Sequence, residues 1–170
     1  MVYKKGPAYR VRPVKEICED ITEAHRVYGD GVQTLFFPAG NTIAMPEKEL
    51  SYICLFATEK FPSLKRITVY GSSQYIARKG PQELGSLRMA GLSRIHVGLE
   101  SGDDEILRKV KKGATASEHV AAGRFVKEAG IELSEYVVLG LGGLERTKEH
   151  IKATAEVLNT IEPDFVRLRT

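Results

Sequence analysis

Short apolar runs rich in β-branched and aromatic residues alternate along the chain with longer segments of helical periodicity. The short runs predict five strands, because each has the length and residue types of a buried strand. Strands that alternate with helices in this way predict a parallel sheet joined by right-handed crossovers. The predicted strands are Val32–Phe37, Arg66–Tyr70, Arg94–Leu99, Glu132–Leu139 and Asp164–Leu168.

The intervening segments predict helices, because apolar residues recur on one face at a period of 3.6 residues. Pro13, Pro46 and Pro81 each stand where the first residue of a helix is expected. Residues 115–118 have the spacing of a capping box, so another helix should begin there. The expected buried faces are Val14, Ile17, Cys18, Ile21 and Ala24; Leu50, Ile53, Cys54, Ala57 and Phe61; Leu84 and Leu87; and Ile151, Ala155 and Leu158.

This alternation predicts an α/β fold, a partial (β/α) TIM-like barrel of about five parallel strands with outer helices. A complete barrel of roughly 250 residues uses about 31 residues per unit, so eight units do not fit in this chain. The pattern opens on a helix and ends inside a strand at Arg167–Thr170. We therefore expect one domain over residues 1–170 that lacks the first strand of the barrel and is truncated at both ends.

Composition and charge limit the classes of protein to which this chain can belong. Apolar residues make up 42% of the 170 residues and charged residues 28%, as in soluble globular domains. A net charge of +3 gives no strong case for nucleic acid, although five cations within residues 1–15 keep RNA association as the least favoured alternative. No apolar run reaches the ~18 residues of a membrane helix. Cys18 and Cys54 form no Cys-x-x-Cys pair, which favours a reduced, cytoplasmic compartment.

Small and polar residues come directly after four of the predicted strands: Pro38–Thr42, Gly71–Gln74, Glu100–Asp104 and Gly140–Gly143. In parallel α/β folds the ligand site lies beyond the carboxyl ends of the strands. Such residues also occur in turns that have no function. Four in succession favour one shared site. No catalytic group and no metal site is predicted, because the four histidines lie on different elements without ligand spacing.

The segment Ser93–Asp104 is the most informative. Glu100 ends a strand that is apolar apart from glycine after His96, so its carboxylate should face the cavity at the strand end. There it could accept hydrogen bonds from an amine or from ribose hydroxyls. The acidic residues 103–105 are expected to cap the next helix. The cations of Arg108–Lys112 are by default the solvent-exposed end of a helix, and alternatively one of them binds a ligand carboxylate.

Several of these segments resemble motifs of the radical SAM superfamily, over nearly the whole chain. HVGLESGDDEIL with the subsequent KKGATASEHVAAGRFVKEAGIEL is similar to the fourth-strand motif of that family and the helical region after it. EYVVLGLGG resembles the fifth-strand motif, and FFPAGNT resembles the second-strand motif. The resemblance implies a radical SAM enzyme, which cleaves S-adenosylmethionine (SAM) reductively to a 5′-deoxyadenosyl radical with a 4Fe–4S cluster.

The resemblance also implies which residues bind the cofactor. Glu100 would contact the ribose or methionine part of SAM, with Ser101 beside it. Lys112 falls where relatives often carry an arginine for the methionine carboxylate, and lysine lacks the bidentate fork of arginine. The remaining implied positions are Gly40 and Asn41 near the methionine amino group, Tyr70 and Ser72 at the third strand, and Gly140 and Gly142 at the adenine.

One defining feature of the family is missing from the sequence. No Cys-x-x-x-Cys-x-x-Cys motif occurs, and Cys18 and Cys54 are expected to be small core residues. Residues 1–13 are similar to the segment after the third cysteine in relatives. The resemblance therefore implies that the cluster loop precedes Met1 and that this fragment, without cluster ligands, is inactive.

The alternative interpretation is a cluster-free (β/α) module that binds a nucleotide or serves as a scaffold. The substrate is unknown on either interpretation. Without a first strand, Val32–Phe37 would be an unpaired edge with no charge and no proline. We therefore expect the fragment to self-associate, most simply as a homodimer.

Overall fold

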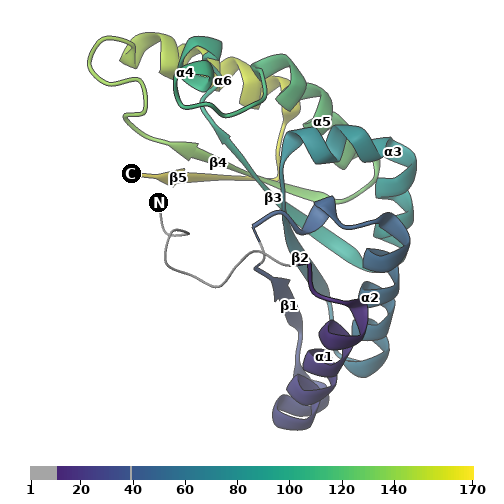
Figure 1. Cartoon of the computed structure of the whole chain (residues 1–170). Helices are drawn as coiled ribbons and strands as arrows, with labels where there is room; N and C mark the ends of the chain where they lie inside the picture. Colours follow the sequence, from purple (N-terminus) through teal and green to yellow (C-terminus); the bar gives the residue numbers. More distant parts are fainter. Residues whose placement is uncertain (1–10, 39) are drawn as a thin grey trace.

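The computed structural model describes residues 11–38 and 40–170 of the chain. Its five strands form one parallel sheet whose spatial order is the same as the chain order, β1-β2-β3-β4-β5. The sheet is curved, and in the described part of the chain the helices lie along its convex side (Figure 1). The strands are β1 (Thr34–Phe37), β2 (Arg66–Gly71), β3 (Leu92–Glu100), β4 (Glu132–Val138) and β5 (Phe165–Arg169).

All five predicted strands are confirmed, with ends that differ by up to two residues. Within the described residues β1 and β5 are the two edges of the sheet, so the sheet is open, as a partial barrel requires. The basic residues and tyrosines of positions 1–10, and the predicted position of a first strand before them, lie outside the described residues.

The helices are α1 (Val14–Tyr28), α2 (Glu47–Lys60), α3 (Ser73–Met89), α4 (Asp104–Lys109), α5 (Ala116–Glu128) and α6 (Thr147–Ile161), with short 3₁₀ turns at Gly29–Gly31 and Thr42–Ala44. Pro13 and Pro46 occupy the residue before α1 and α2 rather than the first helical position. The capping box is present, because the Thr115 side chain accepts from the Glu118 amide and the Glu118 carboxylate accepts from the Thr115 amide. None of the helices in the described part of the chain is long and apolar enough to span a membrane.

Two expectations about the helices are wrong in detail. The third helix starts at Ser73, eight residues before Pro81, which the sequence predicted as its first residue. Gly80 interrupts the helix with a φ of 64°, and Pro81 opens its second part. In α6, Ile151 is 62% exposed, whereas His150 on the neighbouring face is 4% exposed. Helix α6 packs instead through His150, Thr154, Val157 and Ile161.

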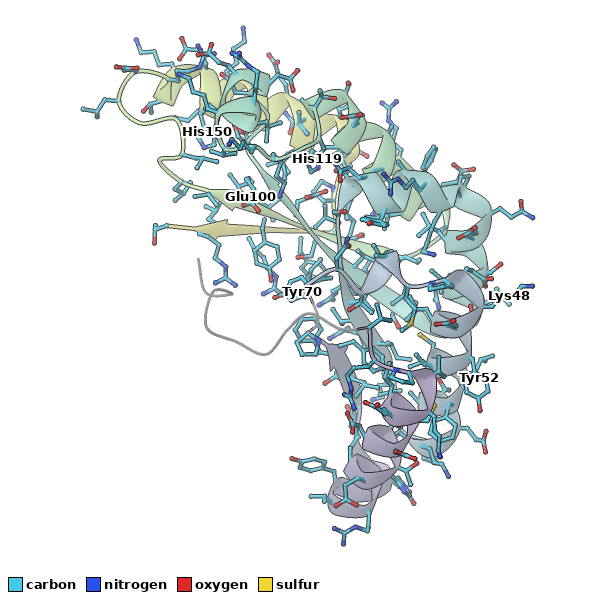
Figure 2. The ribbon with its side chains drawn as sticks, in the orientation of Figure 1. Lys48, Tyr52, Tyr70, Glu100, His119 and His150 are labelled. Carbon is cyan, nitrogen blue, oxygen red and sulfur yellow. The ribbon has the colours of Figure 1, made fainter. Side chains whose placement is uncertain are left out.

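The core lies between the sheet and the helix layer. Side chains that alternate along the strands, such as Ile67 and Val69 of β2, point to the helices and are almost completely buried. They pack against Leu50, Ile53 and Cys54 of α2 and the corresponding faces of α3 and α5. The other set of alternating side chains, which includes Tyr70, points to the concave side of the sheet, where the described residues place no helix (Figure 2).

Candidate functional site

The carboxyl ends of β1 to β4 lie along one edge of the sheet, because all strands are parallel. This carboxyl edge runs across the strands and is distinct from the lateral edges at β1 and β5. The four polar loops predicted from the sequence therefore lie along the same edge. This is the position where ligands bind in parallel α/β folds.

Glu100 and Lys112 form the central pair of this edge. The Lys112 Nζ lies 3.2 Å from Glu100 Oε1, and both side chains are partly buried. A β-bulge between Gly98 and Glu100 shifts the register of β3 against β4 and turns the carboxylate back over Gly98. A Cβ at Gly98 would collide with the carboxylate and lie 3.0 Å from Lys112 Nζ. Glycine at this position therefore makes room for the pair.

The backbone of Glu100 is strained, because its φ is 63° in the left-handed region. A residue with a Cβ pays about 1–2 kcal/mol for this conformation. Such strain is concentrated at functional sites, where the surrounding structure holds it in place. The observation singles out Glu100 among the polar residues at this edge.

The loop after β1 is attached to the end of β2. The Ser72 backbone amide donates to Asn41 Oδ1 at 3.0 Å, and Asn41 Nδ2 lies 3.4 Å from Ser72 Oγ. Gly40 beside Asn41 is exposed, with no atom within 4 Å of where its Cβ would be. The structure thus brings Asn41 and Ser72 together, while Tyr70 of β2 points to the concave side of the sheet (Figure 2).

The loop after β4 is a tight glycine turn. Gly140 has a φ of 75°, and the Gly143 amide donates to the Gly140 carbonyl at 2.9 Å. A Cβ at Gly142 would lie only 2.8 Å from the Arg146 carbonyl oxygen, so the turn requires glycine there. Gly140 and Gly142 border an apolar pocket of about 280 Å³ between β4, α6 and Leu168 of β5. Small-molecule sites usually measure roughly 300–1,000 Å³, so this pocket suits part of a ligand.

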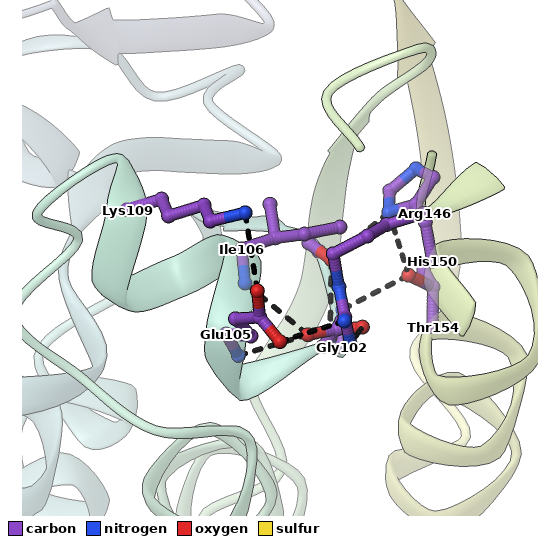
Figure 3. Close-up of polar contacts among 9 residues, drawn as sticks. Gly102, Glu105, Ile106, Lys109, Arg146, His150 and Thr154 are labelled. Atoms are coloured by element: carbon purple, nitrogen blue, oxygen red, sulfur yellow. Dashed lines mark hydrogen bonds and ion pairs between the residues drawn. The ribbon is translucent and has the colours of Figure 1, made fainter. Parts of the chain in front are cut away.

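A polar network fixes the loop after β3 against α6 (Figure 3). Ser101 is fully buried; its Oγ lies 2.9 Å from His150 Nδ1 and accepts from the Asp103 amide. Arg146 binds Asp103 at 2.7 Å and Glu105 at 2.6 Å. Burial raises the pKa of Asp103, but the hydrogen bonds from Arg146 and two backbone amides outweigh it and hold that pKa below its ordinary value. The Ser101 hydroxyl is thus engaged within the protein, and its predicted contact with the cofactor gains no support.

Sequence reasoning missed two buried titratable groups near this edge. Glu135 of β4 is 1% exposed, and its Oε2 has no hydrogen-bond partner in the described part of the chain. Burial raises the pKa of Glu135 to about 8, against an opposing effect of Lys112. Burial, with a smaller contribution from Lys112, lowers the pKa of His119 on α5 to about 4. For Glu135, the signal in the sequence was a glutamate inside the apolar run ELSEYVVL. Local periodicity alone does not show whether such a glutamate is buried.

A family model described as the radical SAM superfamily matches residues 1–158. The chain belongs to the radical SAM superfamily. Among curated proteins, tRNA-2-methylthio-N(6)-dimethylallyladenosine synthase of Chlorobium luteolum is 33% identical over 72 residues, which cover 41% of this chain and 16% of that protein. The tRNA uridine(34) acetyltransferase of Methanocaldococcus jannaschii is 26% identical over 91 residues, 52% of this chain and 17% of that protein.

Solved structures share the fold, among them that of a radical SAM methyltransferase. Methylornithine synthase superposes with a TM-score of 0.67 at 21% identity, over 98% of this chain and 46% of that one. The radical SAM methyltransferase TsrM of Kitasatospora setae, solved with cobalamin and a 4Fe–4S cluster, superposes with a TM-score of 0.72 at 17% identity, over 96% of this chain and 32% of that one. The chain spans less than half the length of these proteins. The five parallel strands and surrounding helices correspond to the TIM-like barrel of this superfamily.

Members of this superfamily use SAM and a 4Fe–4S cluster, whose ligands are thiolates. The thiols of this chain do not fit that role. Cys54 on α2 is completely buried, and burial raises the pKa of its thiol to about 12. Cys18 is half-buried on α1, and burial raises the pKa of its thiol as well. The described residues contain no group of three or more His, Cys, Asp or Glu side chains that could hold a metal ion.

Proposed function

We propose that this chain provides the SAM-binding part of a radical SAM enzyme, whose complete form cleaves SAM reductively to a 5′-deoxyadenosyl radical. The observation that carries the proposal is the Glu100–Lys112 pair, held over Gly98 at the end of β3 by a strained backbone. Stored strain and opposite charges at the strand ends are features that a folded scaffold alone does not need.

The pair fits the methionine end of SAM. An α-amino acid carries an ammonium and a carboxylate on one carbon, and the 3.2 Å between Lys112 Nζ and Glu100 Oε1 places the two complementary charges equally close. On ligand binding, Glu100 would accept from the ammonium or from a ribose hydroxyl, and Lys112 would bind the carboxylate. Both groups exchange one charged partner for another, so neither is left buried and unpaired.

The loops on either side would complete the site. The Asn41–Ser72 contact fixes the end of β1 beside the end of β2, which supports a place for Asn41 and Gly40 near the methionine group. The turn at Gly140 and Gly142, with its apolar pocket, would take the adenine ring. Ser101 is left out of this site, because its hydroxyl already binds His150 and the Asp103 amide.

The cluster, when bound, supplies the electron for cleavage. We propose that its thiolates do not come from these 170 residues, since Cys18 and Cys54 are the only thiols and burial raises the pKa of both. These two reduced, unpaired thiols also support a cytoplasmic location for the protein. The poor fit of both thiols equally supports the second candidate, a cluster-free module that binds a nucleotide.

The test is calorimetry with SAM on the wild type and on Glu100→Gln and Lys112→Met. Loss of a hydrogen bond to a charged group costs roughly 1.5–3 kcal/mol, so each variant should bind about ten- to a hundredfold more weakly. Lys112→Arg should retain binding, because the charge is kept and a second donor is gained. Glu128→Gln, at the exposed end of α5, is the matched control. Equal affinities for all variants would remove Glu100 and Lys112 from the site.

A further inference from the structure

The concave side of the sheet carries aromatic rings from four neighbouring strands. Phe36 of β1 packs against Tyr70 of β2, with 5.1 Å between ring centroids. Tyr70 packs against His96 of β3 at 5.7 Å, and His96 packs against Tyr136 of β4 at 5.5 Å. Because these side chains point away from the helix layer, the rings form a continuous floor that the described helices leave uncovered. Phe36, at its rim, is 42% exposed.

Two arginines of the fifth strand border this floor. Arg167 and Arg169 lie over the Tyr136 ring, with guanidinium-to-centroid distances of 5.8 and 5.1 Å. Arg167 donates to Ser134 Oγ at 3.1 Å. In the described part of the chain neither guanidinium has a carboxylate within ion-pair distance. We call Phe36, Tyr70, His96, Tyr136, Arg167 and Arg169 the concave face.

The remaining charges of this side of the sheet do not neutralise Arg167 and Arg169. Glu132 already binds Arg94 at 2.7 Å and lies 3.9 Å from Arg66, and Glu100 is paired with Lys112 at 3.2 Å. His96 is neutral at pH 7, because burial, and then the charges of Arg167 and Arg94, lower its pKa to about 4. The concave face therefore combines ring surfaces with two positive charges that lack an anion.

We propose that the concave face binds the substrate of the enzyme, and that this substrate is a ring-bearing anion, an aromatic ring system that carries a phosphate or a carboxylate. The ring would lie on Tyr136 and Tyr70, and the anion would be bound by Arg167 and Arg169. Planar guanidinium groups match both phosphate and carboxylate in a bidentate geometry. Aromatic side chains bind flat rings without strict sequence or shape requirements, and stacked arginines strengthen such contacts.

The location next to the candidate SAM site rests on the proposed function. Gly98, over which Glu100 and Lys112 lie, is the register partner of Tyr136 on the neighbouring strand. The Glu100–Lys112 pair thus lies beside the concave face, which includes His96 on the same strand and Tyr136 on the neighbouring strand. A substrate held there would adjoin SAM without occupying its site.

The experiment is calorimetry on the 170-residue chain with four probes. Uridine 5′-monophosphate carries a ring and a phosphate, and indole-3-acetate carries a ring and a carboxylate. Uridine carries the ring without the phosphate, and inorganic phosphate is the anion without a ring. At least one ring-bearing anion should bind tenfold or more tighter than uridine and than inorganic phosphate. The tighter of the two ring-bearing anions identifies the anion class.

Variants assign this binding to the concave face. Arg167→Gln/Arg169→Gln should weaken binding of the tighter probe at least tenfold, and the exposed Arg169→Gln alone should weaken it threefold or more. Arg78→Gln is the matched control, because Arg78 also lies over a tyrosine ring, that of Tyr75 on α3, at 4.9 Å. The control should bind the probe as the wild type does.

The outcomes separate this proposal from the proposed function. Binding of the probe should be unchanged by saturating SAM and by Glu100→Gln. No binding of either ring-bearing anion, or inorganic phosphate binding as tightly as both, would overturn the concave-face proposal while SAM binding stands. Competition between probe and SAM would also overturn it, since the face would then belong to the SAM site. Loss of SAM binding with the probe still bound would refute the proposed function alone.

Discussion

The Glu100 carboxylate fills the space above Gly98 in which any larger residue would place its Cβ. The groups that such a Cβ would displace are the ends of two flexible side chains, Glu100 and Lys112, rather than backbone. The fold should therefore tolerate a larger residue at Gly98, while the geometry of the pair should not. This relationship makes stability and ligand binding separable at one position.

We expect Gly98→Ala to change the free energy of unfolding by less than about 1 kcal/mol and to weaken SAM binding tenfold or more. Urea unfolding and calorimetry measure the two quantities. The double variant Gly98→Ala/Glu100→Ala should show little further loss of binding than either single variant, because both act on the same carboxylate. Gly85→Ala on α3, with open space around its Cβ, is the control and should leave SAM binding unchanged.

Glu100→Gly tests the strained backbone. Glycine removes the left-handed penalty of about 1–2 kcal/mol and adds back roughly 0.5–1 kcal/mol of chain entropy, so stability should be maintained or rise by up to about 1.5 kcal/mol. SAM binding should fall at the same time. Glu162→Gly is the control, because exposed Glu162 ends α6 with a similar φ of 53°. It should gain stability without losing affinity, and a loss of stability in Glu100→Gly would refute the assignment of strain.

The buried Glu135 predicts a pH dependence of stability. Its pKa of about 8 in the folded state lies above the ordinary 4.5, so the folded state retains a proton that the unfolded state has lost. Its contribution is therefore fully present below pH 4.5, falls between pH 4.5 and 8, and stays low above pH 8. Urea unfolding of Glu135→Gln should show more stability than the wild type at pH 8, and the difference should shrink toward pH 5. Parallel pH profiles for the two proteins would contradict the raised pKa.

Local periodicity was enough to predict the strands, because each alternates or clusters apolar residues over a length that only a strand fits. The resemblance of the segment that contains both Glu100 and Lys112 was enough to predict that the two residues lie together, and their side chains are in contact. The burial of α6 could not be predicted from its apolar residues. The backbone of Gly102 packs against Ala153 so closely that a Cβ would collide, and this contact turns His150 and Thr154 inward. Ile151 and Ala155 are exposed as a result.

The concave face could not be predicted from the sequence either, because its contacts form only between strands of the folded sheet. Its rings come from four strands, and their contacts depend on the register between strands, such as Tyr70 with His96 and Gly98 with Tyr136. Each aromatic residue alone is an ordinary strand residue. Only the parallel register makes them neighbours, so no single segment carries the signal.

Anaerobic reconstitution with iron and sulfide tests the thiol assignment. We expect no stoichiometric cluster on the 170-residue chain, because Cys54 is buried and held protonated and Cys18 lies alone on a helix face. Iron counting and electron paramagnetic resonance are the measurements. A discrete 4Fe–4S signal that disappears in Cys18→Ser or Cys54→Ser would overturn the assignment, whereas iron that is equal in wild type and variants is adventitious.

The edge of the sheet at β1 predicts self-association of this chain. β1 pairs only with β2 in the described part of the molecule, and its side chains alternate between exposed and half-buried without a charge or a proline. Natural sheets usually protect such an edge with charged residues, proline or a covering segment. Two copies that pair these edges across a two-fold axis would satisfy the free backbone groups.

Light scattering after size exclusion should therefore show a dimer whose fraction rises with concentration. Thr34→Lys, which places a charge on the exposed edge of each copy, should shift the equilibrium to monomer, while Gln82→Lys on exposed α3 should not. A wild-type chain that stays monomeric at high concentration would show that the β1 edge is covered in solution.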